Sequence, residues 1–312
     1  MLSLAPPELG RLSVCLERSS VEDSTGHAYQ ETPLMSDAIT QAAEVIREAR
    51  ALVVSAGAGM GVDSGLPDFR GTEGFWQAYP AYAKLGMPFH ELANPRWFRK
   101  DPTLAWGFYG HRLNLYQATA PHDGFAVLRR WAEAMPGGAF VFTSNVDGHF
   151  QVAGFDADRI VEVHGTIRLM QCLDECGVGL FPSAEARNMP IVIDGTTFRA
   201  QEPLPACPSC GGLARPNILM FGDGGWDLSH AYEQELRQRG WYRQLGRIPI
   251  AIVECGAGSS IPTVRHYSQG IARQFDAKLI RINLREPQVP EGHIGIAMPA
   301  RAALHAIDAV LA

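Results

Sequence analysis

The sequence predicts an α/β fold, in which a parallel sheet carries helices on both faces. Three observations lead there. Short apolar segments alternate with segments of helical periodicity, a glycine-rich turn directly follows the first apolar segment, and polar side chains follow several of the others. Because ligands of such sheets bind at the carboxyl ends of the strands, those polar residues are the candidates for function.

The composition is typical of a folded soluble protein. The chain has 312 residues, of which 46% are hydrophobic and 19% charged, enough for one large domain or a large and a small one. The net charge of −6 argues against a broad nucleic-acid surface, although a local basic patch stays open. No apolar run has the length of a membrane span, and residues 1–7 do not resemble a secretory signal. We therefore expect a reducing, cytoplasmic setting without nucleic-acid or membrane partners.

The first elements follow from local patterns. Residues 1–35 are predicted to form an N-terminal surface extension, because residues 21–32 are polar with no clear core face. Ser36 and Asp37 are typical of a helix N-cap, and apolar residues from Ile39 to Ala49 mark one face of a helix. That helix leads into an apolar strand at residues 51–54.

Further strands are predicted at residues 139–142, 160–163, 218–221, 248–253 and 278–282, with a helix at 124–135. Polar or glycine residues follow the apolar strands directly, namely Ala56 with its glycine turn, Asn145, His164, Gly256 and Asn283. The function candidates therefore converge on one edge of one sheet.

Gly57, Gly59 and Gly61 follow the first strand. Glycines there let the backbone turn tightly and approach a phosphate through its N–H groups. The dinucleotide fingerprint Gly-x-Gly-x-x-Gly requires its third glycine at position 62, where this chain has Val62, so the glycines alone are a weak signal. An ordinary dehydrogenase turn would also leave residues 64–71, Ser-Gly-Leu-Pro-Asp-Phe-Arg-Gly, unexplained.

These two motifs together resemble the sirtuins, the NAD-dependent protein deacylases. The resemblance spans roughly residues 36–311 and implies a Rossmann-like sheet plus a small zinc-ribbon and helical module. It places a catalytic domain at residues 36–312, with a small lobe at about 74–119 and a zinc module at about 166–215. It implies contacts with NAD by Ala56, Gly57, Ala58, Gly59, Asp68, Phe69, Arg70, Ser144, Asn145, Val146, Asp147, Gly256, Ala257, Gly258, Ser259 and Asn283.

Residues 143–147 resemble the sirtuin signature Thr-Gln-Asn-Ile-Asp, with Ser144 in place of glutamine. By this resemblance Asn145 orients the nicotinamide ribose and Asp147 holds the nicotinamide amide. Taken alone, the segment would favour a polar loop with an Asx-turn. The following His149 and Phe150 reverse the family's usual Leu-His order.

His164 stands where sirtuins keep their catalytic histidine, and the pKa of histidine suits a base near neutral pH. The implied reaction begins when the acyl oxygen of a modified lysine attacks C1′ of the nicotinamide ribose and nicotinamide leaves. His164 then removes a proton from the ribose hydroxyls, so that the 2′-oxygen attacks the imidate carbon. Water completes the release of free lysine and 2′-O-acyl-ADP-ribose. An ADP-ribosyltransferase or NAD glycohydrolase using the same pocket, or a non-catalytic NAD-binding module, are the alternatives.

Four of the six cysteines form two pairs, Cys172 with Cys176 and Cys207 with Cys210. Four thiolates can close a tetrahedral structural zinc site, one per chain. Free buried thiols, or a redox pair at Cys207 and Cys210, are the alternatives. Cys255 ends an apolar strand and is predicted to lie in the core.

Residues 215–223 resemble the sirtuin segment that pairs with the acylated peptide substrate, which implies that Met220, Phe221 and Gly222 contact the substrate. Tyr109 and Arg112 lie three residues apart on a predicted helix. This Tyr-x-x-Arg spacing resembles the sirtuins that remove acidic acyl groups such as succinyl, where Arg112 would hold the distal carboxylate. An aromatic core residue beside a solvated arginine is the alternative.

Overall fold

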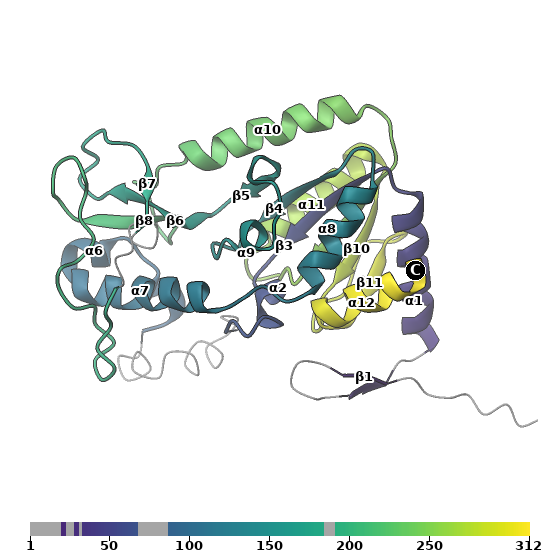
Figure 1. The fold of residues 1–312 in the computed structure, drawn as a ribbon, viewed down its shortest axis with the longest axis horizontal. Coiled ribbons are helices and arrows are strands. Elements are labelled where there is room, and N and C mark those ends of the chain that lie inside the picture. Colours follow the sequence, from purple (N-terminus) through teal and green to yellow (C-terminus); the bar gives the residue numbers. More distant parts are fainter. Residues whose placement is uncertain (1–19, 23–27, 31–32, 68–86, 184–190) are drawn as a thin grey trace, which may run out of the picture.

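The computed structural model describes residues 20–22, 28–30, 33–67, 87–183 and 191–312 (Figure 1). The chain forms two lobes, a large one around a parallel sheet and a smaller one at the opposite end of the molecule. The predicted cofactor residues Asp68, Phe69 and Arg70 lie outside the described residues.

The centre of the large lobe is a six-stranded parallel sheet with the order β11-β10-β9-β3-β4-β5. The strands are β3 (Ala51–Ala56), β4 (Ala139–Thr143), β5 (Ile160–Glu162), β9 (Ile250–Cys255), β10 (Lys278–Ile282) and β11 (Ile294–Ile296). Val54 pairs with Val141 on one side and with Val253 on the other. Every residue of β3 and β9 is buried, as expected for central strands covered on both faces.

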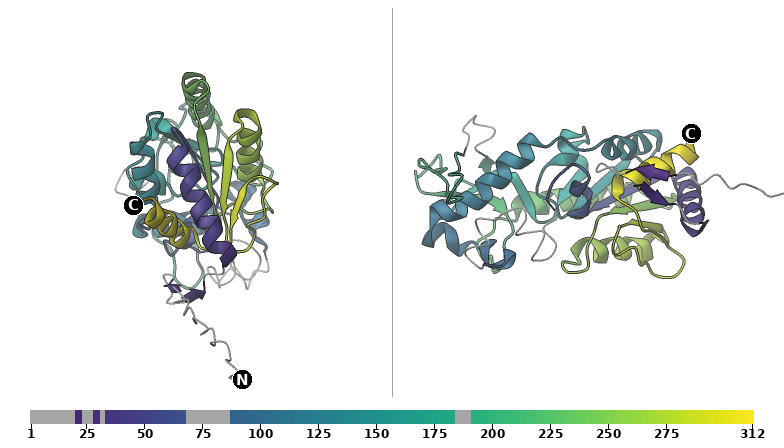
Figure 2. Two further views of the ribbon diagram at one scale, coloured as in Figure 1. Left: turned by 90° about the vertical axis from the view of Figure 1, so that its right-hand side faces the viewer. Right: turned by 90° about the horizontal axis from the view of Figure 1, so that it is seen from below.

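Helices cover both faces of this sheet. The first face carries α1 (Pro33–Glu48), α8 (Gly124–Ala134) and α12 (Ala300–Leu311), and the second carries α10 (Ser229–Leu245) and α11 (Thr263–Phe275). Figure 2 (left) shows α1 and α12 on one side of the strands and α11 on the other. The predicted class of fold is confirmed.

The small lobe combines three helices with an antiparallel sheet of order β7-β6-β8. Its elements are α5 (Phe89–Leu92), α6 (Arg96–Lys100), α7 (Pro102–Ala118), β6 (Gly165–Cys172), β7 (Phe181–Pro182) and β8 (Ala214–Ile218). Asp101 caps α7, since its carboxylate accepts a hydrogen bond from Leu104 N (3.1 Å). Trp106 of α7 donates to the carbonyl of Ala214 (2.9 Å) and so joins the helices to the sheet.

The short elements are β1 (Ser20–Glu22), β2 (Ala28–Gln30), α2 (Gly59–Val62), α9 (His149–Val152) and the 3₁₀ helix η1 (Ala157–Arg159). β1 and β2 pair as an antiparallel ribbon within the predicted extension. No helix of the described ranges combines the length and the apolar character that crossing a bilayer requires.

The predicted N-cap at Ser36 is wrong, because α1 begins three residues earlier, at Pro33. Proline is suited to the first turn of a helix, where its missing N–H would have no partner. Ser36 lies inside the helix, and its carbonyl accepts a hydrogen bond from the hydroxyl of Thr40 (3.0 Å).

The strand predicted at residues 218–221 is also wrong. The strand there is β8, which ends at Ile218 and belongs to the small antiparallel sheet. Its polar residues are buried because they find partners: Asn217 donates to Gln171 (3.0 Å), and Arg215 pairs with Asp223 (2.7 Å). A prediction from hydrophobic patterning alone could not place the strand here, because buried polar residues interrupt the apolar pattern.

Candidate active site

The predicted site lies where the order of the sheet reverses. From β3 the chain moves outward through β4 to β5, and it then returns to β9 on the other side of β3 and continues through β10 to β11. Connections therefore leave the carboxyl ends of β3 and β9 in opposite directions, and the crevice between them is the usual ligand position in such sheets. Ala56 and Cys255 end these two strands in register.

The two loops at this crevice touch through their backbones. Gly57 N–H donates to the carbonyl of Cys255, and Gly59 N–H donates to that of Gly256, both at 3.0 Å. A Cβ added to Gly57 would lie 2.8 Å from Ala257 Cα, and one added to Gly256 would lie 2.3 Å from a backbone nitrogen. Gly256 also has a φ of +63°. Glycine at both positions is thus a steric requirement, and the bare backbone fits the close approach of a dinucleotide.

The loop after β4 is hydrogen-bonded to the glycine loop that follows β3 and contains Gly57, the first glycine loop. The hydroxyl of Thr143 donates to the carbonyl of Ala56 (3.1 Å) and accepts from Asn145 N (3.0 Å). The side-chain amide of Asn145 donates to the carbonyl of Gly57 (3.0 Å), and Ser144 N donates to that of Ala56 (3.1 Å). The structure therefore brings the two predicted cofactor segments together.

Asp147 lies in the same loop. Its carboxylate accepts a hydrogen bond from the backbone of His149 (2.9 Å), which is the Asx-turn that the sequence left open. Burial raises the pKa of Asp147, and the neighbouring His149 opposes this shift. The His149 ring is buried against Phe125, with 6.0 Å between ring centroids, while Phe150 packs into the core of the large lobe.

His164 follows β5 and is half-buried. Burial lowers the pKa of its imidazole, so the neutral form that can accept a proton prevails at neutral pH. The hydroxyl of Thr263, at the start of α11, lies 3.4 Å from Nε2 of His164. The sequence did not predict a role for Thr263. The only feature that could have indicated it is a hydroxyl residue shortly after the glycine loop that follows β9 and begins at Gly256, the second glycine loop.

The second glycine loop is held by residues from the end of β10. Asn283 donates to the carbonyl of Ala257 (2.7 Å). The carboxylate of Glu286 accepts from the backbone (2.8 Å) and the hydroxyl (2.7 Å) of Ser259. Arg265 of α11 joins them, since it donates to the carbonyl of Ala257 (3.0 Å) and pairs with Glu286. Arg265 was absent from the predicted site.

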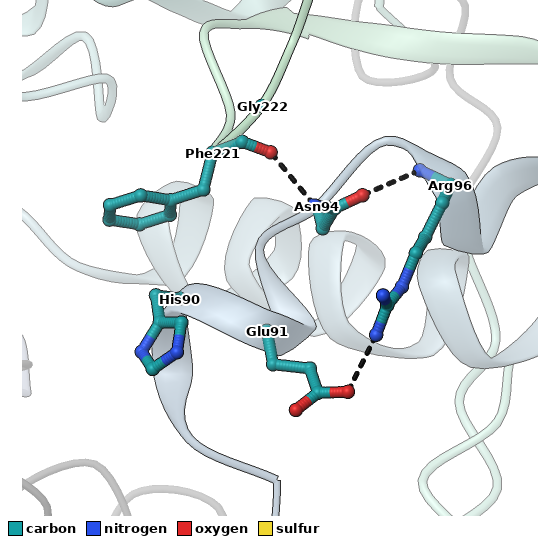
Figure 3. A pocket seen from close by; sticks show the side chains of 6 residues that line it. All are labelled: His90, Glu91, Asn94, Arg96, Phe221 and Gly222. Carbon is teal, nitrogen blue, oxygen red and sulfur yellow. Dashed lines mark hydrogen bonds and ion pairs between the residues drawn. The ribbon is translucent and has the colours of Figure 1, made fainter.

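The predicted substrate segment follows β8. Phe221 N donates to the carbonyl of Ala93 (3.0 Å), and the side chain of Asn94 donates to the carbonyl of Phe221 (2.9 Å). A pocket of about 310 Å³ lies beside Phe221 and Gly222. Figure 3 shows the paired side chains of Glu91 and Arg96 on its wall. Phe221 is 40% exposed, although it is a large hydrophobic residue.

Tyr109 and Arg112 lie together on α7, and both are buried. The Tyr109 ring stacks on Phe98 with 5.7 Å between centroids, and burial raises the pKa of its hydroxyl. Arg112 is only 8% exposed, so the alternative of a solvated arginine is wrong. Its guanidinium donates twice to the hydroxyl of Tyr116 (3.0 and 2.6 Å) and lies 6.0 Å from the centre of the Tyr109 ring.

The four paired cysteines come together in the small lobe. The Sγ atoms of Cys172, Cys176, Cys207 and Cys210 all lie within 4.8 Å of one another. The Sγ–Sγ distances of 3.6 Å between Cys172 and Cys210 and 3.5 Å between Cys176 and Cys207 are close to the edge of about 3.8 Å expected for thiolates bound tetrahedrally to zinc. The donor set fits a structural zinc ion. Cys255 lies apart, buried at the end of β9 as predicted.

The geometry places the chain among dinucleotide-binding α/β proteins that carry a separate metal-binding lobe. The sequence narrows this further. The sequence profile of the Sir2 family matches residues 57–239, and the chain belongs to that family, the sirtuins. The predicted family is thereby confirmed.

Curated relatives carry the same kind of name. The NAD-dependent protein deacylase of Aeropyrum pernix is 31% identical over 187 residues, which is 60% of this chain and 66% of the relative, just under two thirds of its length. The NAD-dependent protein deacylase 2 of Pyrobaculum aerophilum is 30% identical over 243 residues, which is 78% of this chain and 83% of the relative.

Solved structures share the fold. A Sir2 homologue in complex with ADP-ribose superposes with a TM-score of 0.63 at 26% identity, covering 86% of this chain and 95% of that one. A Sir2 homologue in complex with NAD gives a TM-score of 0.61 at 25% identity, covering 86% and 93%. The Rossmann-like sheet with a zinc-ribbon lobe is the shared architecture.

Proposed function

We propose that the chain removes acyl groups from protein lysine with NAD as co-substrate, giving nicotinamide and 2′-O-acyl-ADP-ribose. One observation carries the proposal: Asn145 is bonded to the glycine loop at the same sheet edge where a half-buried His164 has a lowered pKa. The relatives named as NAD-dependent protein deacylases support it.

The proposed roles are those that the resemblance to the family implies, and the positions of the side chains at one sheet edge support them. His164 accepts a proton from a ribose hydroxyl, Asn145 orients that ribose, and Asp147 holds the nicotinamide amide. NAD supplies the electrophilic ribose carbon. The backbone of the glycine loops and the Asn283 amide bind the rest of the dinucleotide. The four cysteines would hold zinc, which fixes the ends of β6 and β8.

The proposed substrate is an acylated protein or peptide that lies along Met220, Phe221 and Gly222. We also propose a cytoplasmic setting without nucleic-acid or membrane partners, supported by the net charge of −6 and by thiols grouped for a metal. Residues 36–312 are the proposed catalytic domain, although the helix that opens it begins at Pro33.

The test incubates the protein with NAD and a panel of acyl-lysine peptides and follows the products by mass spectrometry. We expect equal amounts of nicotinamide and deacylated peptide, and no turnover in folded His164→Ala or Asn145→Ala. His266→Ala, an exposed histidine on α11, is the control that keeps activity. Nicotinamide release without deacylation would indicate an NAD glycohydrolase, or a transferase if ADP-ribose labels protein. Binding of NAD without turnover would indicate a non-catalytic module.

A finer proposal concerns the acyl group: Arg112 holds the carboxylate of an acidic acyl chain beside Tyr109. The support is a buried guanidinium on the helix that the Tyr-x-x-Arg motif predicts, lying over the Tyr109 ring. Arg112→Met should lower kcat/KM for a succinyl peptide by roughly 10- to 150-fold, the equivalent of about 1.5–3 kcal/mol, and affect the acetyl peptide less. The exposed Arg129→Met is the control. Equal losses on both peptides would refute the assignment.

A further inference from the structure

A second cavity lies away from the cofactor edge, between α10 and α11 on the second face of the sheet. Figure 1 shows the two helices. The volume of this groove is about 880 Å³, which is within the range of small-molecule sites. Its lining comes from both helices, from the turn after α10 and from β4, and it includes none of the residues of the glycine loops.

The wall of this groove is an array of aromatic rings. Phe142 of β4 stacks on Tyr267 of α11 at 3.7 Å between centroids and 7° between planes. Tyr242 of α10 shares a hydrogen bond with Tyr267 through the two hydroxyls (2.7 Å) and stacks on Phe275 (4.8 Å). Rings held in this way offer a preformed surface for another planar ring.

The rim of the groove is cationic. Arg239 and Arg243 lie four residues apart on α10, so both reach the same face. Arg239 pairs with Glu235 (3.2 Å), which is the one carboxylate in the lining. Within the part of the chain that the structure describes, Arg243 has no ion pair. The groove therefore carries a net positive charge that favours an anionic ligand.

A buried amide adds the second indication of a ligand. Gln238 lines the groove on the face of α10 that it shares with Tyr242, and it is 5% exposed. Its side-chain amide faces the hydroxyl of Tyr267, and its nitrogen makes no hydrogen bond of normal geometry among the described residues. A buried donor without a partner is unfavourable, and an acceptor on a bound molecule would relieve it.

We propose that this groove binds a planar aromatic molecule that bears a carboxylate or a phosphate. The ring lies against Tyr242 and Tyr267, the oxyanion pairs with Arg243, and Gln238 donates to a polar atom of the ligand. Guanidinium groups bind both oxyanions, and aromatic faces bind the ring. The site is separate from the proposed deacylation site and does not depend on it.

The test titrates the whole chain by calorimetry, as wild type and as Asn283→Ala, which removes a hydrogen bond from the cofactor crevice. The probes are 2-naphthoate and 2-naphthyl phosphate. The probe that binds with the higher affinity shows whether the groove prefers a carboxylate or a phosphate. We expect one site per chain, and affinity at least about tenfold weaker for the neutral 2-naphthalenemethanol. Arg243→Glu should weaken binding at least about tenfold, and Gln238→Leu a few-fold. Arg273→Glu, exposed on α11 outside the groove, should leave it unchanged.

Four results would overturn the proposal. The first is no binding of either probe at millimolar concentration, and the second is equal affinity for wild type and Arg243→Glu. The third is loss of binding in Asn283→Ala, which would assign the probes to the cofactor crevice. The fourth is inorganic phosphate binding as tightly as the naphthyl ligands, because the aromatic wall would then contribute nothing.

Discussion

His164 is half-buried beside the loop that carries the proposed cofactor, and burial lowers the pKa of its imidazole below the ordinary value of 6.5. The neutral imidazole is the form that accepts a proton. We therefore expect kcat/KM to persist as the pH falls through 6.5 and to drop only near the lowered pKa. Rates measured between about pH 5 and 8 check this. An acid limb with its midpoint at or above 6.5 would contradict it.

At the residue scale, the sequence predicted the positions of the candidate side chains that directly follow a strand. Asn145 and His164 lie at the sheet edge where the alternation of strands put them. Thr263 could not be predicted, because its contact with His164 joins residues 99 positions apart. Arg112 has tyrosines three residues before it and four after it on one helix, and only packing shows that its hydrogen bond goes to Tyr116.

At the scale of elements, a buried ion pair joins β9 and β10. The strand register places Arg281 opposite Glu254, and their side chains are 2% and 0% exposed. Glu254→Gln leaves a buried guanidinium uncompensated, so we expect the free energy of unfolding to fall by about 3–5 kcal/mol. Urea unfolding measures this. Replacing both residues, as Glu254→Leu with Arg281→Met, should cost less.

An exposed pair on α8 serves as the control for this prediction. Arg129 and Glu133 lie 2.7 Å apart, with side chains 39% and 59% exposed. Water screens such pairs, so Glu133→Gln should change the free energy of unfolding by less than about 1 kcal/mol. Similar losses for Glu133→Gln and Glu254→Gln would show that the sheet pair does not behave as a buried pair.

Elements with long apolar runs were predicted to within two residues, as β10 and α8 show. The errors have physical causes. β8 contains Arg215 and Asn217, which are buried only because distant residues pair with them. β11 has three residues, too few to give a pattern, and its register with β10 holds it in the sheet.

At the scale of the molecule, the small lobe has its own hydrophobic core, which includes Cys172 and Cys207. The clusters on the two faces of the main sheet are separate from it. Cys207→Ala leaves three zinc ligands, so zinc content should fall, and amide hydrogens of β6, β8 and α7 should exchange faster. β3 and β9 should keep their protection. Metal analysis and hydrogen exchange measure both effects.

Cys255→Ala is the matched control. Cys255 is fully buried at the end of β9, away from the four-cysteine cluster. Its replacement should keep one zinc per chain and reduce protection in the main sheet, because it opens a cavity there. One zinc per chain in Cys207→Ala would contradict the prediction. So would an equal loss of hydrogen-exchange protection in both lobes of Cys207→Ala.

The two-lobe arrangement was predicted from the family resemblance, whereas the strand order was not. Periodicity finds strands but does not say which strands are neighbours, because that depends on where each crossover connection returns. The return from β5 to β9 creates the crevice beside β3, and it is visible only in the folded chain.

The small lobe is made of two insertions into crossover connections. The helices α5 to α7 lie between β3 and β4, and the zinc-binding sheet lies between β5 and β9. Neither insertion contributes a strand to the main sheet, so both can change in length or sequence without altering its ladder. They are not independent, since Trp106 of one bonds Ala214 of the other. A new substrate range is therefore most easily acquired by exchanging both insertions together as one unit, while the main parallel sheet and its cofactor loops stay unchanged.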